Sequence, residues 1–268
     1  MSCLQSWPGK RGLLIGILGA MFAQFFVNWF LNSPASAVAG KEYNSGIIWP
    51  EPKVVTPGTN GGPPSDAVVL FDGKNFGAWN GAGKWVIDAD GGATAKSAMS
   101  TKQSFGDCQL HLEFASPKVV RGKGQGRGNN GVGFMGARYE IQVLDSWENP
   151  TYFDGQCAAL YKQMPPMVNA SRKPGEWQTY DIVFEAPRFQ DKKLVRPGFV
   201  TVIHNGVLVL NHVEIQGATS WDQAPKYTPH APKLPLVLMY HDDPVRFRNI
   251  WNRKASCLKN ASKKRKPC

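Results

Sequence analysis

The feature that most constrains the fold is a series of short apolar or alternating segments that recurs between residues 68 and 250. Clusters of Gly, Pro, Asn and Asp separate one segment from the next, as turns separate strands. After residue 40, no stretch keeps the helical period over three turns. The pattern therefore predicts strands at Val68–Phe71, Trp85–Ile87, Gln109–Phe114, Val132–Met135, Tyr139–Leu144, Thr179–Phe184, Phe199–His204, Val207–Asn211, Leu236–Met239 and Val245–Ile250.

So many short strands in one block predict an all-β fold, built as a two-sheet β-sandwich or jelly roll. The clearest turn signal is His204-Asn205-Gly206-Val207. Asn-Gly supplies the two positive φ angles that a type I′ turn requires, so we expect a tight hairpin there. The 268 residues are enough to bury a sizeable core.

Composition divides the chain into four parts. Residues 38–65 contain five prolines and five glycines with little apolar periodicity, which is typical of a linker or an extended arm. Residues 66–252 continue without a second proline-rich break, and we interpret them as a single domain. Residues 1–37 and 253–268 form the two ends, and neither shows the strand pattern of the middle.

The first 37 residues have the organisation of a secretory signal peptide. Lys10 and Arg11 precede an apolar stretch over residues 13–31, and Ala35 and Ala37 fit an A-x-A cleavage site. The apolar stretch is almost long enough for a membrane anchor, which stays open as the alternative to cleavage. We expect a signal helix and an exported protein, located in the periplasm or the cell envelope.

The formal net charge of +11 belongs to the ends of the chain. Residues 1–37 carry two basic residues and no acid, and residues 253–268 carry seven and no acid, which leaves +2 for residues 38–252. A nearly neutral domain argues against nucleic acid as the partner. We interpret residues 253–268 as a solvated basic tail. Contact with a membrane or cell-envelope polymer, through this tail or the N-terminal segment, is the alternative.

Export bears on the five cysteines. Cleavage of the signal would remove Cys3 and leave an even number in a compartment where disulfides persist. Cys108 and Cys157 either pair with each other or pack as separate thiols. No Cys or His cluster has the spacing of a zinc site.

A glycine-rich segment covers residues 122–131 and contains a formal G-x-G-x-x-G at Gly126, Gly128 and Gly131. A dinucleotide-binding fingerprint follows a strand and opens a helix, whereas this segment leads into an expected strand at residues 132–135. We therefore discount nucleotide binding. The segment is either a simple loop at the rim of the sandwich or a loop that borders a binding site.

Two of the expected strands carry polar residues on one face. Alternation places Arg138, Glu140 and Gln142 together on the face opposite the apolar side chains. Arg246 and Arg248 repeat the arrangement around an inward-facing phenylalanine. A polar sheet face is commonly only solvated, but side chains capable of bidentate hydrogen bonds on two strands favour a binding face.

At these residues the sequence resembles the 3-keto-disaccharide hydrolase domain family, also described as 3-keto-glucoside lyase and 3-keto-2-hydroxy-glucal hydratase domains. The resemblance spans residues 69–251 and implies a concanavalin-like jelly roll, normally exported, that acts on or binds oxidised sugars. The motifs that carry it are Leu70-Phe71-Asp72-Gly73-Lys74-Asn75, the glycine-rich rim at 124–131, Arg138-Tyr-Glu-Ile-Gln-Val-Leu-Asp145, Gly175-Glu-Trp-Gln-Thr-Tyr-Asp181, His204-Asn-Gly206 and Pro244-Val-Arg-Phe-Arg-Asn249.

The implied reaction starts from a sugar with a ketone at C3, which acidifies the hydrogen on C2. A base removes that proton, an electrophile stabilises the enolate, and the substituent on C1 leaves by β-elimination. Water then adds back, so that the net result is hydrolysis. The resemblance therefore implies an enzyme, a 3-keto-glycoside hydrolase with a lyase and hydratase mechanism.

Glu140 and His241 are the candidate catalytic residues, because each is titratable and lies near a family motif. His241 is equally well explained as a hydrogen-bonded histidine at a strand end. The resemblance leaves the enolate to an arginine or to a bound divalent cation, and it does not identify a metal site. The candidate substrate-binding residues are Asn129, Arg138, Gln142, Asp145, Arg246 and Arg248.

The chain departs from the family pattern before its last strand. Members usually read Leu-Gln-x-His-Gly there, whereas this sequence has Met239 in place of Gln and Asp242 in place of Gly. Asn130 also replaces a serine of the rim. These changes favour the alternative hypothesis, a non-catalytic carbohydrate-binding jelly roll, in which aromatic residues such as Trp79, Trp147 and Trp221 would stack on sugar rings.

Overall fold

The computed structural model describes residues 42–255. The predicted signal helix, the cysteines at 3, 257 and 268 and all but the first three residues of the predicted basic tail lie outside this range. Within it, residues 50–255 belong to one compact unit, and none of its helices is long and apolar enough to cross a bilayer.

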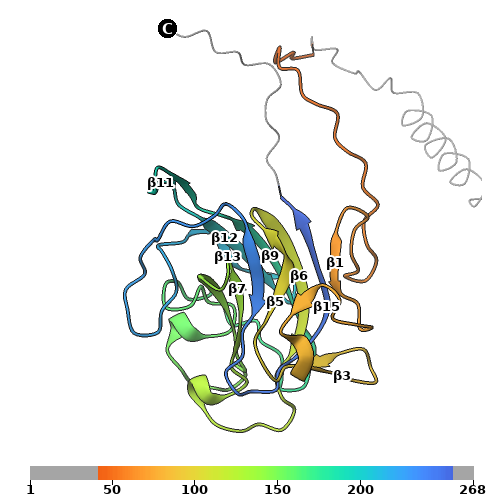
Figure 1. Ribbon diagram of the computed structural model, residues 1–268, viewed down its shortest axis with the longest axis vertical. Coiled ribbons are helices and arrows are strands. Elements are labelled where there is room, and N and C mark those ends of the chain that lie inside the picture. The colour runs from red at the N-terminus through yellow and green to blue at the C-terminus, as the bar shows by residue number, and fades with distance from the viewer. Residues whose placement is uncertain (1–41, 256–268) are drawn as a thin grey trace, which may run out of the picture. The chain divides into compact units, whose positions relative to one another are not determined.

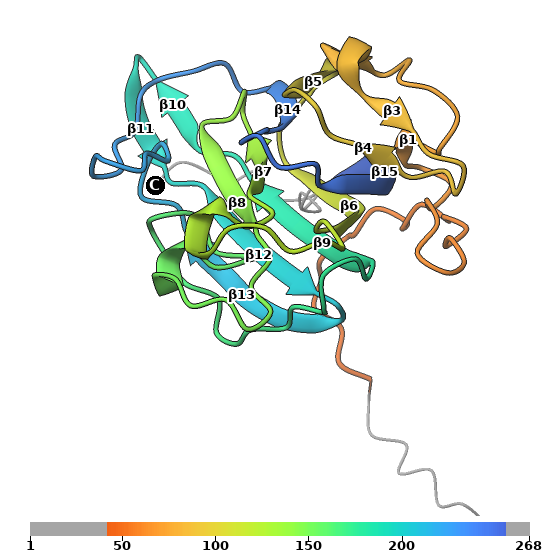
Figure 2. The ribbon, with the colours of Figure 1, turned by 90° about the horizontal axis from the view of Figure 1, so that it is seen from below.

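The compact unit is an all-β sandwich of two antiparallel sheets (Figures 1 and 2), which confirms the predicted fold class. The larger sheet, sheet A, has eight strands, in which β1 also pairs with β15, and the smaller one, sheet B, has five. A separate hairpin consists of β10 (Arg188–Gln190) and β11 (Lys193–Arg196). The order in sheet A is β13 (Val207–Glu214), β12 (Phe199–His204), β9 (Gln178–Glu185), β6 (Cys108–Ala115), β15 (Arg246–Lys254), β4 (Ala93–Thr94) and β3 (Val86–Ile87), with β1 (Val68–Phe71) beside β15. The order in sheet B is β2 (Trp79–Asn80), β5 (Met99–Phe105), β14 (Leu234–Leu238), β7 (Asn130–Phe134) and β8 (Tyr139–Val143).

Three short 3₁₀ helices occur in the loops of the described residues. They are η1 (Ala82–Lys84), η2 (Gly124–Gly126) and η3 (Phe153–Gly155). The glycine-rich segment at 122–131 thus holds η2 and then leads into β7, as the sequence predicts, rather than into a helix of a nucleotide site.

The core lies between the two sheets and is formed by alternate residues of their strands. Phe134 of sheet B stacks on Phe184 of sheet A, with ring centroids 4.4 Å apart. Tyr180 of β9 crosses the core and donates a hydrogen bond from its hydroxyl to the carbonyl of Gln142 in β8, at 2.7 Å. This hydrogen bond links the two sheets at β8, the strand that carries the candidate residues Glu140 and Gln142.

The predicted hairpin at Asn205-Gly206 joins β12 and β13, and both residues have positive φ angles, 52° and 80°. Five strands are not predicted by the sequence pattern, namely β2, β4, β5, β10 and β11. In β5 the run Met99-Ser-Thr-Lys-Gln-Ser-Phe105 is mostly polar, and its pairing with β14 rather than its own pattern makes it a strand.

Several boundaries and placements differ from expectation because distant residues form the contacts. Residues 56–65 of the predicted linker fold onto sheet A, where the Gly61 carbonyl accepts hydrogen bonds from Asn249 and Trp251. β15 extends two residues into the predicted basic tail, and Arg253 forms a bidentate pair with Asp66.

Two further sequence hypotheses are resolved in the core. Cys108 and Cys157 are separate buried thiols, and burial raises the pKa of Cys108 to about 12. Trp79 cannot stack on a sugar, because it is 4% exposed and its indole N–H donates to the Leu70 carbonyl. Trp221, in contrast, is 77% exposed.

Candidate functional site

The candidate site lies on the outer face of sheet B, where β8 presents Glu140 and Gln142 away from the core. The chain at residues 158–161 runs alongside β8 as an additional short pairing, with a bridge between Ile141 and Leu160. The Tyr161 N–H donates to the Glu140 carbonyl at 3.1 Å. In this antiparallel register Tyr161 is directly opposite Glu140, so their side chains share one face of the sheet.

Glu140 is a buried carboxyl group without a basic neighbour among the described residues. The residue is 5% exposed, and burial raises the pKa of its side chain from the ordinary value near 4.5 to about 7. No counter-charge offsets the cost of burying the carboxylate. Glu140 therefore exchanges a proton close to neutral pH, as a general acid or base requires.

Gly131 of β7 makes room for this carboxyl group. A Cβ atom added at Gly131 would lie 2.4 Å from Glu140 Oε1 and 2.9 Å from Met239 Sδ. The Glu140 side chain thus extends over the glycine and toward Met239, which follows β14. The close approach of the carboxyl group therefore requires a glycine at position 131, a requirement that the glycine-rich sequence alone does not reveal.

Amide side chains surround the other side of Glu140. The Gln142 amide lies between Glu140 and Gln125. With its nitrogen toward β7, Gln142 donates to the Asn130 carbonyl at 2.8 Å and to Glu140 Oε1 at 3.3 Å. With its nitrogen turned the other way, it donates to Gln125 Oε1 at 2.9 Å and is 3.4 Å from Asn129 Oδ1. The two orientations are alternatives, so the Gln142 nitrogen bonds either to Glu140 or toward Gln125 and Asn129. Gln142, predicted to orient a substrate, therefore lies directly beside Glu140, and Asn129, predicted for the same role, lies on the far side of Gln142.

A pair of tyrosines completes the site and was not identified in the sequence. The hydroxyls of Tyr152 and Tyr161 are 2.6 Å apart, and burial, Tyr152 and the nearby Glu140 all raise the pKa of Tyr161. The Lys162 ammonium lies 3.9 Å from the ring centroid of Tyr152 and 3.5 Å from Asp154. Tyr161 therefore stays a neutral proton donor beside Glu140. Nothing in the local pattern of residues 152–162 indicates this position.

The structure places the two predicted arginines of β15 on the other side of the sandwich. Phe247 between them is buried in the core, so Arg246 and Arg248 lie on the outer face of sheet A. Arg246 pairs with Asp88 and Asp90, and Arg248 pairs with Glu113 at 2.6 Å. They are not part of the group around Glu140.

The remaining predicted residues lie at the ends of the strands. Arg138 is in the β7–β8 turn, where its guanidinium donates to the Met135 carbonyl at 3.2 Å. Asp145 follows β8 and is buried in an ion pair with Arg127, at 2.6 Å. His241 is exposed in the loop between β14 and β15, two residues after Met239.

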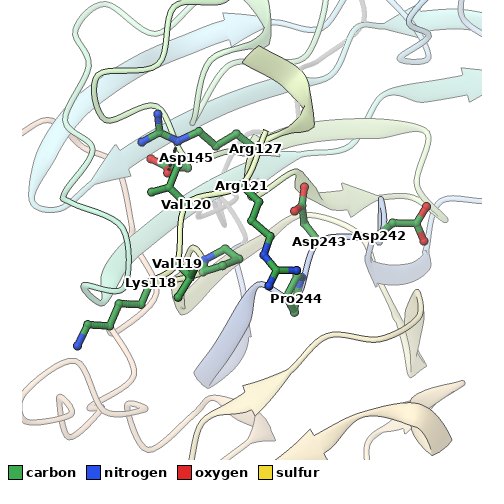
Figure 3. A pocket seen from close by; sticks show the side chains of 11 residues that line it. Lys118, Val119, Val120, Arg121, Arg127, Asp145, Asp242, Asp243 and Pro244 are labelled. Atoms are coloured by element: carbon green, nitrogen blue, oxygen red, sulfur yellow. Dashed lines mark hydrogen bonds and ion pairs between the residues drawn. The ribbon is translucent and has the colours of Figure 1, made fainter. Parts of the chain in front are cut away.

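A cavity of about 450 Å³ opens beside this site (Figure 3). Asn129 connects the two, because its N–H donates to Asp243, which lines the cavity, while its side chain faces Gln142. Within residues 42–255, no three His, Cys, Asp or Glu side chains gather as metal ligands would. The chemistry that these residues support is proton transfer by Glu140 and Tyr161 next to amides that bind hydroxyl or carbonyl oxygens.

The chain is similar to a known protein family and to solved structures. The family model described as a 3-keto-alpha-glucoside-1,2-lyase-like domain matches residues 66–253. A crystal structure of a candidate glycosyl hydrolase from Parabacteroides distasonis is 43% identical, with a TM-score of 0.74, over 80% of this chain and 95% of that chain.

Two more candidate glycosyl hydrolases from the same organism show the same fold. One is 24% identical with a TM-score of 0.51, over 70% of this chain and 99% of that one. The other is 16% identical with a TM-score of 0.52, over 71% and 94%. No protein with a curated description matches this chain.

Proposed function

Because the chain belongs to the 3-keto-alpha-glucoside-1,2-lyase-like domain family, and so is a carbohydrate-processing protein, we propose that it cleaves 3-keto-glycosides by elimination and hydration. The observation that carries the proposal is Glu140, a buried carboxyl group on the outer face of sheet B that has no ion-pair partner among the described residues and whose pKa is raised to about 7. If the predicted signal acts, this reaction takes place in the periplasm or the cell envelope.

In the proposed reaction the carboxylate of Glu140 takes the proton from C2 of the sugar. The electron pair of the C2–H bond forms the enolate of the C3 ketone and then the C1=C2 double bond, as the C1–O bond to the leaving group breaks. The leaving oxygen takes a proton from a general acid. Water then adds its hydroxyl to C1 and a proton to C2, which gives the 3-keto-sugar and the free alcohol.

Tyr161 is the group best placed to act as this acid. It is cross-strand from Glu140, and its hydroxyl is hydrogen-bonded to Tyr152, which can return a proton to it. The amides of Gln142 and Asn129 would hold the ketone oxygen or neighbouring hydroxyls. His241, the other predicted catalytic residue, is exposed in the β14–β15 loop and has no part in the proposed reaction.

The test uses two 3-keto-α-glucosides with small leaving groups, 4-nitrophenol and methanol. We expect the full-length protein to release both alcohols, and Glu140→Gln to slow both by about 10²–10⁴-fold. Glu113→Gln, which removes a carboxylate on sheet A, is the matched control and should keep the rate. A substrate with deuterium at C2 should react more slowly, because the C2–H bond breaks in the elimination.

Tyr161→Phe gives a sharper test of the acid. It should slow release of methanol, a poor leaving group, by about 10²-fold or more, and affect release of 4-nitrophenol much less. Tyr227→Phe, which removes a phenol that bonds to the Ile215 carbonyl outside the site, is the control. Binding of 3-keto-sugars without release of either alcohol would overturn the proposal and favour the carbohydrate-binding alternative.

A further inference from the structure

The hairpin of β10 and β11 projects from one end of the sandwich. Two residues separate it from β9 on one side and two from β12 on the other, so it extends beyond the last paired residues of these strands. It pairs with no other strand among the described residues. Figure 1 shows the hairpin at the same end of the compact unit as the end of β15.

The base of the hairpin is fixed to the sandwich, whereas its second strand is exposed. Arg188 pairs with Asp107, the residue before β6, and the N–H of Ala255, the residue after β15, donates to the Asp107 carbonyl. The Phe189 ring packs edge-on against His230, with ring centroids 5.0 Å apart. All four residues of β11 are exposed. The sandwich thus holds the hairpin in a defined position and presents β11 to the solvent.

This end of the molecule has an excess of basic side chains. A second cavity, of about 460 Å³, lies at the base of the hairpin. The hairpin and the lining of this cavity together contain six basic residues and three acids, which leaves a net charge of +3. The basic residues are Arg188, Lys192, Lys193, Arg196, Lys233 and Lys254.

The lysines of this set are free to bind an anion. Both arginines form ion pairs, and so do the two acids of the cavity, Asp66 and Asp107. Among residues 42–255, none of the four lysines has an acidic partner, and Asp191 is the one acid of the set without a basic partner. The unpaired charge at this end is therefore predominantly positive and suits an anionic surface.

The turn of the hairpin contains a lysine where a glycine would fit better. Asp191 and Lys192 have φ angles of 49° and 62°, and a type I′ turn requires positive φ at both positions. Asn-Gly is the favoured pair, as at Asn205-Gly206 in the β12–β13 turn. Lys192 therefore has a strained backbone. A positive charge is present at the tip against the local conformational preference, which points to a function for that charge.

Two exposed apolar side chains follow these lysines in β11. Leu194 and Val195 are 40% and 59% exposed, and they point to opposite faces of the hairpin because they are successive residues of a strand. Apolar side chains add nothing to the binding of a soluble polyanion. They suit the surface of an anionic bilayer, where apolar groups enter the boundary of the acyl chains and ammonium groups stay at the phosphates.

We propose that the β10–β11 hairpin and the basic cavity at its base dock the folded domain onto an anionic phospholipid bilayer. Leu194 and Val195 enter the interface, while Lys192 and Lys193 contact the headgroups. This contact is made by the folded domain and does not depend on the proposed reaction.

Docking in this way also orients the candidate site. Pro244, which lines the cavity beside Glu140, lies just before β15, whereas Lys254, which lines the basic cavity, ends it. The two cavities therefore lie at opposite ends of a nine-residue strand. With the hairpin on the bilayer, the cavity beside Glu140 is turned away from the lipid.

Lysine footprinting of the full-length protein tests this contact. The acetylation rate of each lysine is measured by mass spectrometry without lipid, with phosphatidylcholine vesicles, and with vesicles that contain about one-third phosphatidylglycerol. On the anionic vesicles alone, Lys192 and Lys193 should react more slowly by at least about threefold. Lys96 and Lys123 are the internal controls, because they are exposed near the opposite end, and they should keep their rates.

A pair of double variants tests the apolar part of the contact. Leu194→Ser combined with Val195→Ser should remove most of the protection of Lys192 and Lys193. Val207→Ser combined with Leu208→Ser is the matched control and should keep it, since these residues are 43% and 41% exposed beside the β12–β13 turn at the opposite end.

Three results would overturn the inference. The first is an unchanged rate for Lys192 and Lys193 on anionic vesicles, and the second is equal slowing of Lys96 and Lys123. The third is full protection in the Leu194→Ser, Val195→Ser variant, which would show that charge alone makes the contact, as with a soluble acidic polymer. Each of these results leaves the proposed function intact, because the reaction at Glu140 does not use the hairpin.

Discussion

The two outer faces of the sandwich carry charged residues at the same alternating spacing, but only those on sheet A have partners of opposite charge. On sheet A, Arg246 and Arg248 each pair with an acid, and the Arg248 guanidinium stacks on Trp177 with 4.1 Å to the ring centroid. His111 also meets Asp181, at 2.7 Å. On sheet B, Glu140 meets amides and tyrosines and no basic partner among residues 42–255.

This difference shows what separates a structural charge from a chemically active one. A carboxylate beside an arginine stays ionised and contributes an ion pair, whereas a carboxylate buried without one has a raised pKa and holds its proton near neutrality. Alternation in the sequence predicts both faces equally. Whether a partner is present depends on residues far along the chain, such as Asp88 beside Arg246.

The largest effect on stability is expected from the removal of Asp145, the buried carboxylate that pairs with Arg127 after β8. Asp145→Ala leaves the guanidinium of Arg127, whose side chain is only 13% exposed, without its counter-charge and should lower the free energy of unfolding by about 3 kcal/mol. Urea denaturation measures the change. The double variant with Arg127→Met should recover much of the loss. If the free energy of unfolding falls only as much as expected for an exposed ion pair, the Arg127–Asp145 pair is solvated and does not hold this end of the sandwich in place.

The second effect concerns Glu140 and has the opposite sign. Its folded-state pKa is above the unfolded value, so the folded state binds the proton more tightly. Its full stabilising effect is present below about pH 4.5 and is lost as the pH rises through about 7. Glu140→Gln should therefore be more stable than the unchanged protein above pH 7, by about 3 kcal/mol at most, relative to their difference at pH 4.

Urea denaturation of both proteins between pH 4 and pH 8.5 measures this difference. The gap between them should widen with pH in the direction stated. A gap that stays constant over the whole range would show that the Glu140 carboxyl group has an ordinary pKa in the folded protein.

A smaller effect on stability is expected from removal of an acid on sheet A. Glu113→Gln removes the partner of Arg248 and weakens the hydrogen bond from Asn249, at 2.9 Å, but the guanidinium stays partly solvated. The free energy of unfolding should fall by about 1 kcal/mol. Thermal unfolding of Glu113→Gln and of the double variant with Arg248→Met checks this. A gain in stability, as expected for Glu140→Gln, would remove the contrast between the faces.

The smallest effect on stability is expected at Asp242, where the chain departs from the family pattern. Asp242 stands where family members have Gly, and its φ of 63° is in the left-handed region that glycine adopts freely. Asp242→Gly should change the free energy of unfolding by no more than about 1 kcal/mol, whereas Asp242→Ala should destabilise the protein more. Comparing the Tm values of the two variants decides this. Equal values would show that the turn imposes no strain.

Much of the fold could be predicted from the sequence, because alternation and the Asn205-Gly206 turn act locally. The position of Glu140 on an outward strand face was visible for the same reason. The raised pKa of Glu140 could not be predicted, because the burial of its carboxyl group depends on contacts outside the strand. Tyr161 comes from a segment without a strand pattern, and Gly131 lets the carboxyl group approach β7 closely. The arginine partners on sheet A and the Arg127–Asp145 pair were equally invisible, because each joins residues far apart in the sequence.

The most direct test is the titration of Glu140 itself. The carboxyl carbon of this residue can be followed by ¹³C NMR between pH 3 and pH 9, and identified by its absence from the spectrum of Glu140→Gln. We predict a midpoint near pH 7, well above the ordinary value of 4.5. A midpoint near 4.5 would mean that Glu140 is a solvated carboxylate, and it would contradict its assignment as the base on sheet B.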